Sequence, residues 1–404
     1  MLAISPRSTI VIFVVFLIVA VAFLSVSNFR LPMLTLVKEA FALVLLAFAV
    51  FGALSAIWSP LPLASIGKSS LLAATVLATF VCLHSRSAVP AALLRFALLG
   101  LIVGLVLQLI IICSEVLSDQ WLTRFALKHL PALRIEAGKH ARFVDGQVLL
   151  MSSAELSRRI AMVTLFGAPL CYAVLVCIRS RLRWIVGLGA VIGYAVCIGL
   201  GPHQTSMIAV SVGVCVALLA TVRFRWAVGL VSASWVLVWL LAIPGARVLY
   251  FAEIYNSTWL FRSARHRVVI WNATAEKTMD NLFFGIGADA TRAVRDMEQM
   301  WEMDGEFVRS VGSHAHNVYL QTWFELGLVG ACLGMLVGLL ILRKIAALSS
   351  LARVAALGQF ALVATLFAAS YSLWQVWLLS AVALAIVFLG LAAEVEANVS
   401  GGSA

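Results

Sequence analysis

Side chains capable of acid–base chemistry concentrate in residues 313–330, where a polar stretch enters an apolar run. The members of this segment with an imidazole, amide or carboxyl group are His314, His316, Asn317, Gln321 and Glu325. At about 100° per residue, a helix would place all of them on one face except His316, which would lie nearly opposite His314. A polar stripe entering an apolar helix must face other protein or a wet cavity. We therefore expect His314 to border such a cavity.

Three interpretations of this stripe are open. Metal ligands on a helix favour spacings of three or four residues, and no nearby Cys or carboxylate completes a set with His314 and His316, which disfavours a metal site. A purely structural hydrogen-bonded stripe is the second interpretation. The third is a catalytic histidine, since an imidazole titrates near neutral pH and can take a proton from a hydroxyl.

Cations cluster at the expected start of a helix over residues 264–279, which Ser263 can cap. The cluster comprises Arg262, Arg265, His266 and Arg267. Helix N-termini favour anions, and the guanidinium fork matches two phosphate oxygens, so a phosphate or pyrophosphate clamp is one interpretation. The other is a solvated basic end that pairs with acids of the next helix, expected over residues 288–303. Glu302 and Asp304 lie at the end of that acidic helix, and we expect them on a solvated face rather than at a metal.

The composition shows what must position these residues. Of the 404 residues, 63% are hydrophobic and only 12% are charged, which excludes a soluble enzyme and a disordered chain. The chain is therefore expected to be a polytopic membrane protein. The net charge of +11 would suggest nucleic acid only in a soluble protein, so we expect no nucleic-acid partner. Seven cysteines lie in apolar runs without CxxC spacing and are expected to be core residues.

Eleven apolar stretches are long enough to cross a bilayer, which takes roughly 17–25 helical residues. They lie near residues 10–27, 36–57, 67–84, 90–113, 160–178, 184–201, 205–221, 226–244, 317–342, 354–371 and 373–392. Arg7 weakly favours a cytoplasmic N-terminus, which would require a twelfth span. The two long connections are residues 114–159 and 245–316, and the whole chain, residues 1–404, is expected to form a single transmembrane domain.

The basic residues predict the orientation. One set of short loops holds twelve Lys and Arg, and the alternate set holds only Lys68, so the first set is expected in the cytoplasm. Both long connections then lie outside, and they carry more than half of all charges and five of the seven histidines. The scarcity of ionisable residues within the spans argues against a transporter, while a non-catalytic scaffold would not need His and Arg concentrated there. An enzyme site is expected at the outer interface.

These motifs resemble the O-antigen ligase family of bacterial inner-membrane glycosyltransferases. The resemblance rests on the Arg-led helix, residues 281–287 (Asn-Leu-Phe-Phe-Gly-Ile-Gly), the acidic helix and residues 313–330. Residues 55–60 (Ser-Ala-Ile-Trp-Ser-Pro) are similar to a feature of that family, and Arg142 stands where it has an Arg in its first long loop. In one departure, residues 201–206 lack the Ser/Thr-Arg pair common in relatives.

The resemblance implies an all-α, GT-C-like bundle of about eleven or twelve spans with a helical periplasmic cap. It implies inverting transfer of O-antigen from undecaprenyl pyrophosphate to the outer sugar of lipid A-core, completing lipopolysaccharide at the periplasmic face of a Gram-negative inner membrane. The long loops would be periplasmic, the second would carry catalytic elements, and no metal, nucleotide sugar or other cofactor would take part. An O-antigen polymerase or a protein O-glycosylase would use the same donor, and a flippase is the alternative of another class.

Together with this resemblance, the residues suggest the following roles. His314 and Arg265 are the expected catalytic residues: His314 would orient or deprotonate the attacking hydroxyl, and Arg265 would stabilise the leaving pyrophosphate. The expected substrate-binding residues are Arg142, Arg267, His316, Asn317, Gln321 and Glu325.

Overall fold

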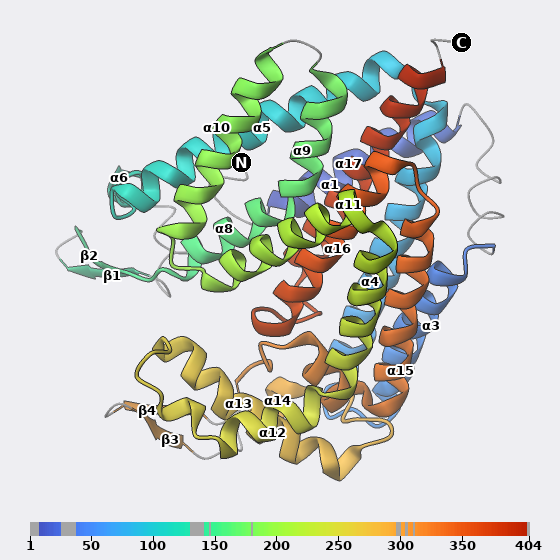
Figure 1. The fold of residues 1–404 in the computed structure, drawn as a ribbon. Helices are drawn as coiled ribbons and strands as arrows, with labels where there is room; N and C mark the ends of the chain where they lie inside the picture. The colour runs from blue at the N-terminus through green and yellow to red at the C-terminus, as the bar shows by residue number, and fades with distance from the viewer. Residues whose placement is uncertain are drawn as a thin grey trace.

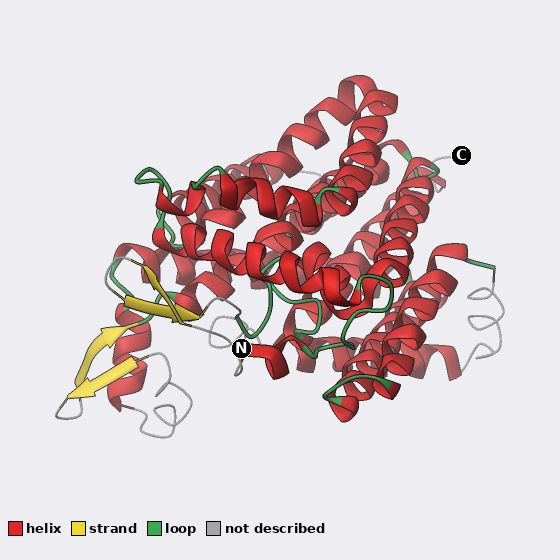
Figure 2. Cartoon of the chain, turned by 90° about the horizontal axis from the view of Figure 1, so that it is seen from below, coloured by secondary structure: helices red, strands yellow, loops and turns green. Residues whose placement is uncertain are grey.

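The computed structural model of the chain is predominantly helical, as the sequence predicts (Figure 1). It describes residues 8–25, 38–129, 141–144, 147–178, 181–295, 300–303, 306–309 and 312–401. Two short β-hairpins lie at one side of the helices (Figure 2). The all-α polytopic class is thus confirmed, with hairpins added to it.

The long helices of the bundle are α1 (Ser8–Ser25), α3 (Ala40–Leu54), α4 (Pro62–Ser85), α5 (Ala91–Leu117), α10 (Leu182–Gly199), α11 (Gln204–Leu240), α15 (Val318–Ala346), α16 (Ser350–Ala369) and α17 (Val376–Gly401). The shorter helices are α6 (Trp121–His129), α8 (Ala154–Leu165), α9 (Gly167–Cys177), α12 (Ala242–Phe251), α13 (Arg262–Thr278) and α14 (Thr291–Arg295). The 3₁₀ turns are Ser55–Ile57, Arg86–Ala88, Ile254–Asn256 and Met279–Asn281. The hairpins pair β1 (Ala141–Val144) with β2 (Gln147–Met151) and β3 (Met300–Met303) with β4 (Glu306–Arg309).

Each expected span coincides with a helix, with one arm of a helix or, for residues 160–178, with the bent pair α8 and α9. Among the described residues, eight helices are long and apolar enough to cross a membrane, or nine if the bent pair α8 and α9 forms one span. Helix α11 counts once, although non-helical backbone at Arg223 breaks it into two arms that match the spans expected at 205–221 and 226–244. Helix α1 contributes only a shorter apolar stretch. The count of eight is lower than the expected eleven because of the bent pair, α11 and α1.

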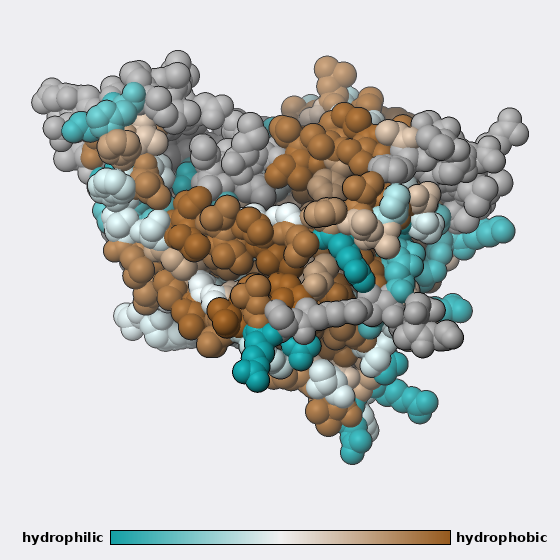
Figure 3. Space-filling view, turned by 90° about the horizontal axis from the view of Figure 1, so that it is seen from above, coloured by the Kyte–Doolittle hydropathy of each residue, from teal (hydrophilic) through white to brown (hydrophobic). Residues whose placement is uncertain are grey.

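Helix α17 lies inside the bundle, in contact with α1, α4, α5 and α9. Its side chains build much of the main core, where Leu378, Ala381 and Ala392 are fully buried. Apolar side chains of the outer helices, such as Leu188 of α10 and Leu218 of α11, point away from the protein, as bilayer-facing residues do. Viewed from the end at which α17 finishes, the surface is largely apolar, with separate hydrophilic patches (Figure 3).

The predicted grouping of loops is confirmed by contacts at one end of the bundle. The α3–α4, α10–α11 and α16–α17 connections all reach the region that holds α12 to α14 (Figure 1). Ser65 donates to the Ala288 carbonyl over 2.7 Å, and Tyr371 and His203 hydrogen-bond over 3.2 Å. The basic loops occupy the other end, where Arg86 pairs with Glu394 at 3.1 Å.

The cap is only partly as expected. Helix α13 confirms the helix predicted over 264–279, but the helix predicted over 288–303 is wrong, because α14 ends at Arg295 and the hairpin β3–β4 follows. The sequence between these strands is Asp-Gly, which favours a two-residue hairpin turn, and β1 and β2 also flank an Asp-Gly pair. Glu302 therefore lies on a strand, and Asp304 lies outside the described residues.

Candidate active site

Helix α15 begins later than the polar stripe requires. The side-chain oxygen of Asn317 accepts a 3.0 Å hydrogen bond from the Leu320 N–H and caps the helix, which starts at Val318. His314 and His316 therefore precede the helix, and the expectation that His314 shares a helical face with Gln321 and Glu325 is wrong. Asn317 acts here as a helix cap.

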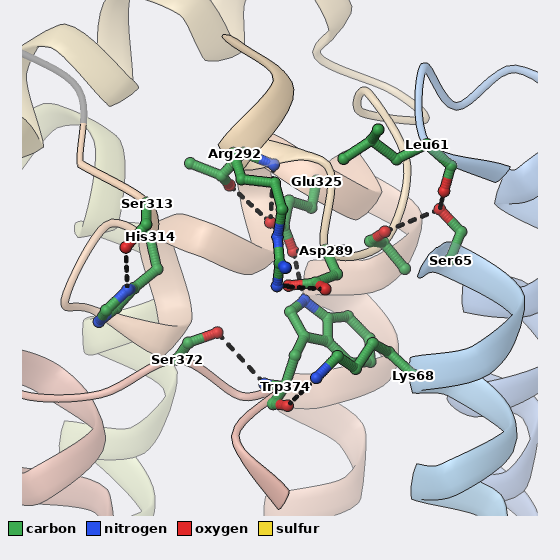
Figure 4. Close-up of polar contacts among 12 residues, drawn as sticks. Leu61, Ser65, Lys68, Asp289, Arg292, Ser313, His314, Glu325, Ser372 and Trp374 are labelled. Atoms are coloured by element: carbon green, nitrogen blue, oxygen red, sulfur yellow. Dashed lines mark hydrogen bonds and ion pairs between the residues drawn. The ribbon is translucent and has the colours of Figure 1, made fainter. Parts of the chain in front are cut away.

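The loop instead places the two histidines side by side. The rings of His314 and His316 lie with centroids 4.1 Å apart at an interplanar angle of 40°. Nδ1 of His314 is 3.1 Å from the Ser313 hydroxyl (Figure 4). Nδ1 of His316 is 2.9 Å from the backbone carbonyl of Ser370. Because a carbonyl can only accept, Nδ1 of neutral His316 carries the proton and its Nε2 presents a lone pair.

A third histidine, His203, is linked to this pair through Ser370 and was not among the residues expected from the sequence. Its Nδ1 is 2.7 Å from the Ser206 hydroxyl, and its Nε2 is 3.2 Å from the Tyr371 hydroxyl and 3.4 Å from the Ser370 hydroxyl. Ser370 thereby joins His203 to His316, one through its side chain and the other through its carbonyl. The sequence feature that could have indicated it is a histidine in a predicted outer loop, directly before an apolar span.

Arg267 brings positive charge to the three histidines. It extends from α13 and donates to the Thr205 hydroxyl over 3.4 Å. Burial is the main cause that lowers the pKa of His203 to about 4, that of His314 to about 3 and that of His316 to about 4, and the nearby Arg267 lowers all three further. The three imidazoles are therefore neutral acceptors at neutral pH. Burial also lowers the pKa of Arg267 itself.

Further cations surround His314. Arg292 and Arg158 both lower its pKa by their charge. Arg292 is about half exposed, and one of its guanidinium nitrogens donates to both carboxylate oxygens of Asp289, at 2.8 and 2.6 Å (Figure 4). Arg265 is half-buried on α13, two residues before Arg267. The charges of three guanidinium groups, those of Arg158, Arg267 and Arg292, therefore act on His314.

Arg142 lies in β1, where its backbone is paired with Leu150 of β2. Its side chain lies outside the described part of the structure, so its expected role stays a prediction. Among the described residues, no group of three or more His, Cys, Asp and Glu side chains is arranged to hold a metal ion.

Glu325 is a fully buried hydrogen-bond acceptor that holds the loop after α13. One carboxylate oxygen accepts from the Thr291 N–H at 3.2 Å, the Thr291 hydroxyl at 2.5 Å and Gln321 Nε2 at 3.0 Å. The other accepts from the Asp289 N–H at 3.1 Å and from the Trp374 indole (Figure 4). With both oxygens engaged, Glu325 can position Asp289 and Arg292 but is not free to react.

Two glycine-containing segments interlock beneath this network. Helix α15 is broken at Gly327, whose φ is 61°, and residues 282–287 fill the break. Ile286 and Gly287 donate to the carbonyls of Phe324 and Glu325 over 3.1 and 2.8 Å, and the Leu328 N–H returns a 2.8 Å bond to Leu282. The backbone groups freed by the break are thus satisfied within the protein, as a membrane helix requires.

The geometry and the family comparison point to the same stretch of chain. Residues 203–335 match the family model of the O-antigen ligases. The matched segment starts at His203 and contains α13, both paired histidines and Glu325. The resemblance expected from the sequence is confirmed by this match.

Two relatives match over a similar length. A Rickettsia conorii protein with the provisional name of polysaccharide ligase is 27% identical over 122 residues, which is 29% of each chain. A Rickettsia felis protein with the same provisional name is 29% identical over 120 residues, 29% of this chain and 30% of its own. The chain thus matches less than a third of the length of each relative.

Proposed function

We propose that this protein transfers a polysaccharide from a lipid pyrophosphate to a sugar hydroxyl at the end of the bundle that holds the histidines. The observation that carries the proposal is the convergence of His203, His314 and His316 with Arg267 inside the segment that matches the O-antigen ligases. The proposed donor is undecaprenyl-pyrophosphate-linked O-antigen. The proposed acceptor is lipid A-core, reached from the periplasmic face of a Gram-negative inner membrane.

The arginines suit the leaving group. A lipid pyrophosphate is a weak base, so its departure needs stabilisation of negative charge more than protonation. Guanidinium groups supply this as fixed donors aimed at the oxygens where charge develops. Arg267 and Arg265 on α13 would hold the pyrophosphate, and Arg292, whose charge also acts on His314, would add to them.

The histidines suit the nucleophile. The acceptor hydroxyl oxygen forms a bond to the anomeric carbon while the bond from that carbon to the phosphate oxygen breaks, and undecaprenyl pyrophosphate departs with the electron pair. The hydroxyl proton passes to the histidine pair, where Nε2 of His316 offers a lone pair and His314 lies against it. Attack from the side opposite the leaving group inverts the anomeric configuration. Bound pyrophosphate raises the pKa of both imidazoles, so basicity increases when the donor is present.

Metal-independent transfer is part of the proposal, since cationic side chains supply the charge that a divalent ion would provide. A polymerase or a protein O-glycosylase would use the same chemistry on another acceptor. A flippase is less well supported, because Glu325, the buried acid within α15, is fully engaged in structural hydrogen bonds.

The test is the lipopolysaccharide profile of a deletion strain. A ligase deletion should yield lipid A-core without O-antigen while lipid-linked polymer accumulates. Loss of polymer, with single repeats still joined to the core, would indicate a polymerase, and an unchanged profile would contradict both. The wild-type gene should restore O-antigen. His314→Ala and Arg265→Ala should not, although both proteins should be present in the membrane at wild-type amounts.

A further inference from the structure

A basic pocket lies at the end of the bundle opposite the histidines. It is an open cavity of about 890 Å³, lined by Arg223, Phe224, Arg225, Trp226, Val228, Ala346 and Arg353. Three segments meet there: the break in α11, the end of α15 and the start of α16. The break at Arg223 therefore forms one wall of a cavity that contains three arginines.

The three arginines have no acidic partner among the described residues. The acids at this end are engaged elsewhere: Glu394 pairs with Arg86, Glu39 pairs with Lys344, and Glu396 accepts from Tyr172 and Ser349. Like charges concentrated in one cavity repel one another unless an anion joins them. An anion bound among the three arginines would relieve this repulsion.

The surroundings of Arg353 favour the binding of such an anion. Its guanidinium lies 4.5 Å from the centre of the Phe224 ring, and its Nε is buried with no hydrogen-bond partner in the described structure. Stacking on an aromatic ring fixes the plane of the fork, and a buried donor without an acceptor favours a ligand oxygen. Phosphate oxygens match this fork.

The surroundings indicate a lipid rather than a free ion. Trp226 lines the pocket and Val222 precedes Arg223 in the chain; they are 73% and 72% exposed, and both lie on a helix that is apolar enough to cross a membrane. Indole rings favour the level of lipid headgroups, and basic pockets between membrane helices hold anionic headgroups. Acyl chains could then run along the exposed apolar surface of α11.

We propose that the pocket of Arg223, Arg225 and Arg353 binds the phosphate of an anionic phospholipid headgroup. The site is separate from the proposed reaction centre at the other end of the bundle. In this position a bound lipid would hold the break of α11 against the connection between α15 and α16.

The experiment measures phosphatidylglycerol retained by the full-length protein in detergent, using native mass spectrometry. The triple variant Arg223→Gln, Arg225→Gln and Arg353→Gln should weaken phosphatidylglycerol retention by roughly fivefold per arginine. Arg183→Gln is the matched control, because Arg183 also lies beside a ring, that of Trp184, outside the pocket. It should bind like the wild type. Equal retention by the triple variant and the control would overturn the proposal.

A second arm separates the lipid from a free ion and guards against misfolding. Inorganic phosphate should stabilise the wild type far less than phosphatidylglycerol in thermal unfolding, and equal stabilisation would contradict the lipid assignment. Arg353→Lys keeps the positive charge that orients the loop in the membrane but loses the planar fork. It should insert normally and retain less lipid than the wild type. Full retention by this variant would remove Arg353 from the site.

Discussion

The backbone N–H of Gly287 donates a 2.8 Å hydrogen bond to the carbonyl of Glu325, at the point where α15 breaks. The two residues are far apart in the sequence, yet the contact brings the loop after α13 onto the helix that follows the histidines. The proposed site depends on this junction, because α13 carries Arg265 and Arg267 and the loop leads into α14, which carries Arg292.

Gly327→Ala should destabilise the protein by at least about 2 kcal/mol. A Cβ at this residue would lie 2.4 Å from the Phe283 carbonyl, and the φ of 61° disfavours any side chain. Gly104→Ala in α5 is the control, because no atom lies within 4 Å of its added Cβ. Thermal unfolding in detergent should show a lower midpoint for Gly327→Ala only. Equal midpoints would mean that the break does not constrain the fold.

Glu325→Gln should cost roughly 2–3 kcal/mol of stability, since hydrogen bonds to a charged group contribute about 1.5–3 kcal/mol and an amide offers only one acceptor oxygen. The N–H groups of Thr291 and Asp289 lie on different carboxylate oxygens, so at least one must lose its partner. The control is Glu276→Gln, an exposed acid of α13 that accepts only from Asn272 among the described contacts. Chemical unfolding of the two variants measures the difference, and similar stabilities would contradict this role for Glu325.

Arg267→Ala should lower transfer by about 10²–10³, the usual effect of removing one donor that stabilises developing charge. Arg267→Lys should restore only part of it, because an ammonium lacks the fork. Arg247→Ala on α12 is the control, an exposed arginine near the ring of Phe251. Rates are compared in a reconstituted transfer assay.

The same variant should move the acid limb of the pH–rate profile to higher pH. Arg267 lowers the pKa of the histidines, so its removal lets them take a proton more readily. A normal rate and an unmoved profile in Arg267→Ala would separate this residue from the reaction.

His203 should make folding sensitive to acid. Burial lowers its pKa from 6.5 to about 4, so between these values the unfolded chain binds a proton that the folded protein excludes. Stability is unaffected above about pH 6.5 and falls as the pH drops toward 4, by about 2 kcal/mol at pH 5. Thermal unfolding from pH 7 to 5 should show a smaller loss in His203→Gln than in the wild type. Parallel curves would contradict the assignment.

The architecture could be predicted because length and hydropathy determine it. A long run of apolar residues must cross the bilayer. The positions of the basic residues predict which connections share one end of the bundle. The contact between Tyr371 of the α16–α17 connection and His203 of the α10–α11 connection confirms this grouping. Helix α13 was also predictable, but its expected cap is wrong: the helix begins at Arg262 with Phe261 at the N-cap, so Ser263 lies inside the helix. These are local signals.

The site could be predicted only in part, because contacts between distant segments decide it. The carbonyl that orients His316 belongs to Ser370, 54 residues away. His203 had no motif around it, and its partners come from the α16–α17 connection. The start of α15 depended on Asn317 as a cap, which a polar stripe does not reveal. The spacing of the polar residues therefore identified the right segment but wrongly predicted that His314 and His316 lie on opposite faces of a helix.

The most direct test of the histidine pair is transfer in vitro by the reconstituted full-length protein, with a lipid-pyrophosphate-linked glycan as donor and lipid A-core as acceptor. His314→Ala and His316→Ala should each lower the rate by about 10²–10⁴. His84→Ala should retain it, because His84 contacts Phe80 at the opposite end of the bundle. Wild-type rates in both His314→Ala and His316→Ala, with the proteins correctly folded, would contradict the proposed reaction centre.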